Sequence, residues 1–110
     1  MDIEITGVHY HVSDATKEHI HKKMEHWQKM AHTLNRIHLS ITPKQEHHHE
    51  TFEVHLHAKL DWQHAPTVDI RRHGENLWAV IDETFEGFSH AVHKHKDKHT
   101  HVSHDRVNLE

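Results

Sequence analysis

The chain has 110 residues, enough for one domain with a single hydrophobic core and too few for two. Only 34% of the residues are hydrophobic, none is cysteine, and no apolar run approaches the roughly 18 residues of a membrane span, so disulfides, thiolate metal sites and a membrane-spanning helix are excluded. With its 20 histidines neutral the chain carries a formal charge of −4, and because imidazole titrates near pH ~6.5, mild acidification makes that charge positive.

The first predicted elements are a short strand and a helix. Residues 3–7 alternate between apolar and polar side chains, and a glycine ends the strand. Ser13 or Asp14 can then cap a helix. Its buried stripe recurs at spacings of four, three, four and three and comprises Ile20, Met24, Trp27, Ala31 and Leu34. The opposite side of this helix presents a mostly positive face, formed by Lys22, Lys23, His26 and Lys29.

Three further strands are predicted in the middle of the chain. Residues 37–41 alternate and form a second strand, which Pro43 is expected to end, followed by a loop over residues 44–50. Residues 52–60 alternate without a break and give the clearest strand, and residues 67–72 form its neighbour.

A long helix follows Gly74. Its apolar seam runs at spacings of four, four, three and four through Leu77, Ile81, Phe85, Phe88 and Val92. A basic cluster follows directly, comprising Lys94, His95, Lys96, Lys98 and His99. Such a cluster on an acidic protein indicates either a surface that binds a polyanion or a solvated helix end, where cations complement the helix dipole.

Each strand has one apolar face and each helix one apolar stripe, so the sequence predicts an α+β fold with the order β-α-β-β-β-α. We expect a two-layer sandwich in which one four-stranded sheet carries both helices on the same face. The first two strands should be parallel and the others antiparallel. Residues 1–99 are expected to form this domain and residues 100–110 a flexible tail.

Several stretches of the chain follow the pattern of one known family. They are residues 5–7, 13–15, 17–24 and 35–37, and most specifically residues 76–82 followed at the family's distance by residues 94–98. Through these stretches the chain resembles the family of ribosome hibernation-promoting factors and ribosome-associated inhibitors. It implies a double-stranded-RNA-binding-like fold and a cytoplasmic protein that is monomeric when free. The implied role is occupancy of the messenger and transfer RNA channel of the small ribosomal subunit, which silences translation in stationary phase or stress, with no catalysis and no cofactor.

The resemblance also implies which residues contact ribosomal RNA. The family's basic positions correspond to Lys22, Lys23, Arg36, Lys94, Lys96 and Lys98. His26, Lys29 and His90 lie beside these lysines in the predicted helices and complete the expected RNA-binding set. This chain departs from the family at Glu86, Gly87 and His90 in the second helix and at His47 to His49, where relatives carry lysine or arginine, so part of the fixed positive charge is replaced by charge that titrates.

Two alternatives remain open in the sequence, a histidine-rich metal-binding protein and a pH-responsive module that binds a protein partner. Pairs such as His55 and His57 share one face of a strand, as metal ligands can. No pair has an obvious third ligand fixed in sequence, so we expect no physiological metal site. An enzyme is not expected either, because the chain has no nucleophile elbow or phosphate-binding loop, and Asp82 and Glu83 are interpreted as solvent-facing charge.

Overall fold

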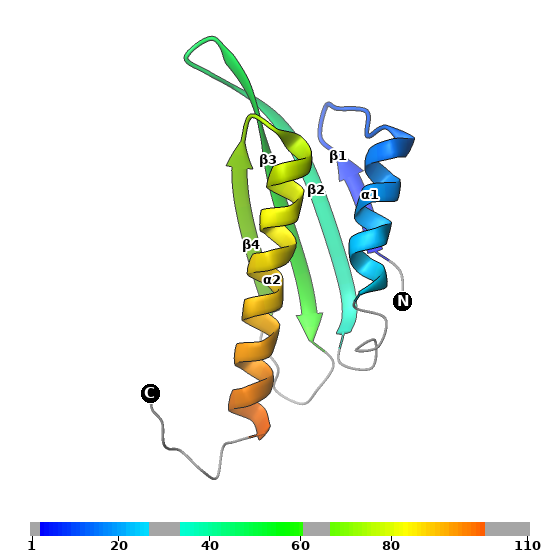
Figure 1. Ribbon diagram of the computed structural model, residues 1–110, viewed down its shortest axis with the longest axis vertical. Helices are drawn as coiled ribbons and strands as arrows, with labels where there is room; N and C mark the ends of the chain where they lie inside the picture. Colours follow the sequence, from blue (N-terminus) through cyan, green and yellow to red (C-terminus); the bar gives the residue numbers. More distant parts are fainter. Residues whose placement is uncertain (1–2, 27–33, 61–66, 101–110) are drawn as a thin grey trace.

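The computed structural model describes residues 3–26, 34–60 and 67–100, with side chains described for residues 3–26, 36–59 and 67–94. In these residues, four strands form one sheet in the order β1-β2-β3-β4, and both helices cover the same face of it (Figure 1). The elements along the chain are β1 (Ile3–Gly7), α1 (Asp14–Glu25), β2 (Leu34–Glu46), β3 (His49–Leu60), β4 (Thr67–Gly74) and α2 (Leu77–Thr100). The predicted two-layer α+β sandwich and its element order are confirmed.

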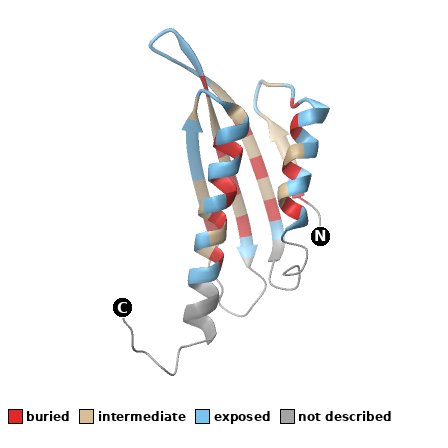
Figure 2. Cartoon of the chain, in the orientation of Figure 1, coloured by how far each residue is buried: buried red, intermediate tan, exposed pale blue. Residues whose placement is uncertain are grey.

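The strand directions also agree with the prediction. β1 and β2 are parallel, with Ile5 opposite Leu39, and the pairs β2–β3 and β3–β4 are antiparallel. The buried residues of the sheet and of the two helices form a single core. Figure 2 marks buried positions in red on both layers. Phe85 and Phe88 belong to it, 5% and 0% exposed, which confirms the apolar seam of α2. None of the helices in the described ranges is long and apolar enough to cross a membrane.

α1 begins where the sequence indicates and ends earlier than predicted. The Ser13 hydroxyl accepts a hydrogen bond from the Thr16 amide at 3.1 Å, which caps the helix. The prediction that Leu34 continues the helical stripe was wrong, because Leu34 starts β2 and lies opposite Leu60. A register shift between Leu34 and Arg36 accommodates the break in alternation. Trp27, Ala31 and Lys29 lie outside the described residues.

The second strand is longer than predicted. Pro43 does not end β2; it lies opposite Phe52, and pairing with β3 continues to Glu46 and His49. The expected loop over residues 44–50 is therefore mostly strand, with a tight turn at His47 and His48, whose φ angles are 51° and 67°. β1 pairs with β2 only as far as Ile41. On the β1 side of β2, Pro43 therefore has no neighbouring strand to which a backbone N–H would have to donate, so the proline is tolerated there. The hairpin extends past the rest of the sheet (Figure 1).

Gly87 lets α2 lie close to β4. A methyl group at this position would stand 2.7 Å from Arg72 Nη2 and 3.1 Å from Ile70 Cγ2, both on β4. Glycine in a helix costs about 1 kcal/mol relative to alanine. The end of the Arg72 side chain could shift, so the closeness of Ile70 is the packing reason for a glycine here.

Candidate nucleic-acid interface

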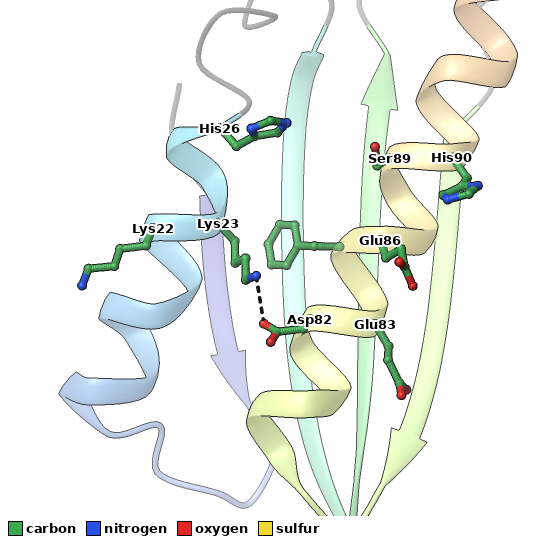
Figure 3. A pocket seen from close by; sticks show the side chains of 9 residues that line it. Lys22, Lys23, His26, Asp82, Glu83, Glu86, Ser89 and His90 are labelled. Carbon is green, nitrogen blue, oxygen red and sulfur yellow. Dashed lines mark ion pairs between the residues drawn. The ribbon is translucent and has the colours of Figure 1, made fainter.

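A groove of about 720 Å³ lies between α1 and α2. Figure 3 shows its lining side chains, which come from both helices. Lys22, Lys23 and His26 belong to the last turn and C-cap of α1. α2 contributes the buried seam residue Phe85 and, from the flank beside the seam, Asp82, Glu83, Glu86, Ser89 and His90.

Polar and stacking contacts hold the two helices side by side at one end of the groove. Asp82 Oδ1 lies 2.7 Å from His19 Nε2 and 3.3 Å from Lys23 Nζ, so one carboxylate of α2 binds two side chains of α1. The Trp78 ring stacks on His19 with a centroid distance of 4.4 Å and an interplanar angle of 10°. Its indole N–H donates to the Thr16 hydroxyl at 3.2 Å. These contacts set the spacing of the helices and hence the shape of the groove.

The groove has a mixed charge. Its two lysines face three carboxylates, Asp82, Glu83 and Glu86, so its net charge is −1 while its two histidines are neutral. Protonation of both His26 and His90 changes that charge to +1. The sign of the groove charge therefore depends on whether these two imidazoles carry a proton.

The structure brings together four of the residues that sequence reasoning singled out, Lys22, Lys23, His26 and His90. Lys94 is exposed and lies one helical turn beyond His90 on α2. Lys96 and Lys98 belong to the last turns of α2, where the structure describes the backbone only.

Arg36 lies elsewhere. It precedes the buried Ile37 in β2, so strand alternation places it on the sheet face opposite the helices. The groove and Arg36 are thus on different faces of the sheet. A contact of Arg36 with the same stretch of RNA would require that RNA to reach around the edge of the sheet.

Sequence reasoning missed the acidic lining of the groove. Asp82 and Glu83 were interpreted as solvent-facing charge, and both are exposed, yet both line the groove and Asp82 pairs with Lys23. The available signal was position along the helix. Asp82 and Glu86 are four residues apart, as are Asp82 and Trp78, and all three lie on a flank beside the apolar seam.

Comparison with known proteins agrees with this fold. A structure of a ribosomal subunit interface protein from Coxiella burnetii is similar over 89% of this chain and 100% of its own, with a TM-score of 0.76 at 20% identity. The N-terminal domain of Thermus thermophilus Protein Y is similar over 84% of this chain and 96% of its own, with a TM-score of 0.62 at 15% identity. A search of curated protein sequences finds no match.

The family itself is shown by sequence. The family model described as sigma 54 modulation protein / S30EA ribosomal protein matches residues 3–100, which is nearly the whole chain and includes both helices of the groove. The match confirms the resemblance to the hibernation-promoting factors drawn from the sequence. The chain therefore belongs to the sigma 54 modulation protein / S30EA ribosomal protein family.

Proposed function

We propose that this protein binds the small ribosomal subunit and silences translation by occupying the channel for messenger and transfer RNA. It acts in the cytoplasm by binding, with no catalytic step. Family membership supports association with the ribosome. The neighbour from Coxiella burnetii is described as a ribosomal subunit interface protein, which agrees with the proposal.

The observation that carries the proposal is that basic side chains from α1, and a histidine from α2, line one groove between the two helices. Lys22 and Lys23 of α1 and His90 of α2 line it, and Lys94 follows one turn later. Lysines that follow a phosphate backbone gain affinity by releasing counterions, so binding should fall steeply as salt rises. Recognition by groove shape suits this surface better than base stacking, because Trp78, the large aromatic exposed beside it, already stacks on His19.

The acidic lining sets the conditions under which binding is strong. Asp82 engages Lys23, and Glu83 and Glu86 repel phosphate, so the fixed charges of the groove lining, which sum to −1, do not attract a phosphate backbone. Protonated His26 and His90 together with the two lysines would outweigh the three carboxylates. The proposal therefore includes a rise in affinity on mild acidification.

Co-sedimentation with purified small subunits tests the proposal. The protein should sediment with the subunits at low salt, more completely at pH 6 than at pH 7, and be released as salt rises. If it stays in the supernatant at both pH values in low salt, the proposal is wrong. Recovery from lysate with a partner free of ribosomal RNA would favour the protein-binding alternative.

The pH dependence should reside in the groove histidines. Between pH 7.5 and pH 6 we expect the affinity of the unaltered protein for small subunits to rise about fivefold at fixed salt, since each proton bound by His26 or His90 adds one positive charge to the groove. The variant His26→Gln, His90→Gln should lose most of this rise. Equilibrium titration with labelled subunits at the two pH values measures it.

His11→Gln combined with His21→Gln is the matched control, because both histidines are exposed and neither lines the groove. This control should keep the full pH response. A response that is unchanged in the groove variant, or equally reduced in both, would show that the groove histidines are not its source.

A further inference from the structure

The sheet face opposite the helices carries a cluster of side chains that the groove does not use. In β3 the residues Val54 and Leu56 are buried under the helices, so strand alternation turns His55 and His57 to the open face. On the neighbouring antiparallel strand β4, Asp69 lies directly opposite His57. Strand pairing thus brings a carboxylate to two histidines that are two residues apart in sequence.

The three side chains converge on one point. His55 Nε2 and His57 Nδ1 each lie 2.8 Å from the same oxygen, Asp69 Oδ1. One ligand atom from each residue lies within 4.8 Å of the others. The two imidazole rings are 6.4 Å apart and inclined at 63°, so their nitrogens approach the carboxylate from different directions.

This spacing suits a small divalent ion. Zinc binds imidazole nitrogen and carboxylate oxygen at about 2.0–2.1 Å, which sets neighbouring ligands of a tetrahedral site about 3.4 Å apart. The observed 2.8 Å contacts need to lengthen by about 0.6 Å to reach that spacing, and the ligand atoms of all three residues already lie within 4.8 Å of one another. The site is also accessible, because the side chains of His55, His57 and Asp69 are 25%, 45% and 47% exposed.

The surrounding charges permit a cation here. Hydrogen bonds from His57 and then His55 lower the pKa of Asp69, so its carboxylate is ionised at neutral pH. The nearest fixed positive charge on this face of β4 is Arg71, whose Nη1 lies 3.9 Å from Glu53 Oε2, an ion pair that offsets its repulsion. A third histidine, His38 on β2, lies opposite His57 in the sheet and is held by a 2.8 Å contact between its Nε2 and the Thr6 hydroxyl.

We propose that His55, His57 and Asp69 form a binding site for a divalent metal ion, most suitably zinc. Water would occupy the fourth coordination position. Sequence analysis identified the pair His55 and His57 but no third ligand, and therefore predicted no physiological metal site. Folding supplies the third ligand from β4. Two imidazoles and a carboxylate are a ligand set that zinc, copper and nickel accept.

Isothermal titration calorimetry, in which zinc is added to the metal-free 110-residue chain, tests the site. The other histidines contribute weak binding, so the decisive result is a first equivalent that binds at least tenfold tighter than the rest. Asp69→Asn and, separately, His57→Gln should abolish this first step. Because these side chains are partly exposed, thermal melts of the metal-free variants should match that of the unaltered chain.

The matched control is His47→Gln with His48→Gln, which removes two exposed histidines from the turn between β2 and β3. It should keep the tight first equivalent. Absence of a tight equivalent in the unaltered chain, or its survival in both cluster variants, would overturn the proposal. The site and the groove lie on opposite faces of the sheet, so a variant that loses ribosome binding through Lys22 and Lys94 should still bind zinc, and either proposal can fail without the other.

Discussion

Reversing two cationic side chains, with Lys22→Glu and Lys94→Glu in one variant, is expected to weaken binding to small ribosomal subunits by roughly 60-fold or more in 0.1 M salt. Each lysine at a phosphate contributes about 0.9 to the slope of log affinity against log salt, which corresponds to about eightfold at this concentration. Glutamate at the same places adds repulsion. Both lysines are exposed, so the thermal melt should change little. Titration over a series of salt concentrations gives both the affinity and the slope.

The matched control reverses Lys17 and Lys59 to glutamate. Both are exposed and neither lines the groove; Lys59 follows the buried Ala58 in β3 and therefore lies on the opposite sheet face. The change in net charge is the same, so any effect of overall charge appears equally in both variants. The salt slope should fall by about 1.8 in the Lys22→Glu, Lys94→Glu variant only. An equal loss of affinity in the two variants would show that binding depends on net charge and not on the positions of Lys22 and Lys94.

The layers of the fold were predictable because each element has one apolar face. Alternation over residues 52–60 and the four-four-three-four spacing of the α2 seam fix which side chains point inward, and only one packing buries both sets. The elements that sequence reasoning misjudged are those whose ends depend on a neighbouring strand. Pro43 ends a strand only where a partner needs its N–H, and β1 stops short of it. Leu34 fits the helical stripe as well as it fits a strand, and pairing with Leu60 decides the outcome.

The candidate site was predictable in its cations and not in its anions. Lys22, Lys23, His26 and His90 were found from helical spacing and family resemblance, and the groove brings these four together. The acidic flank of α2 lines the groove only because α1 lies close to it. The stacking of Trp78 on His19 sets that distance between the helices, and a tertiary contact of this kind is not contained in the pattern of either helix. The position of Arg36, by contrast, could have been read from the alternation with Ile37.

The proposed metal site on the open face of the sheet was also only partly predictable from the sequence. His55 and His57 were visible as a pair, because alternation places both on one face. Asp69 could be joined to them only once the register between β3 and β4 was known, since a shift of one residue would turn it toward the helices. Long-range register is information that one strand's pattern does not contain.

Neutralising the acidic lining of the groove should have the opposite effect to reversing the charges of Lys22 and Lys94. The variant Asp82→Asn, Glu83→Gln, Glu86→Gln is expected to bind small subunits more than tenfold tighter at pH 7.5. It changes the groove charge from −1 to +2 and releases Lys23 from Asp82, and one added phosphate contact alone is worth about eightfold in 0.1 M salt. Asparagine still accepts the hydrogen bond from His19, and an exposed ion pair contributes under about 1 kcal/mol, so the helices should stay in place.

The control for this gain removes three exposed carboxylates outside the groove, with Glu4→Gln, Glu50→Gln and Glu75→Gln. Net charge rises by the same amount, so a tightening confined to the groove variant assigns the effect to position. Such a result would also explain why this chain carries Glu86 and His90 where relatives carry lysine or arginine. The carboxylates would lower the affinity for RNA at neutral pH, and protonation of the groove histidines would then raise it. If the groove variant binds no more tightly than the control, the carboxylates do not face RNA, and the RNA-binding surface must be sought outside the groove.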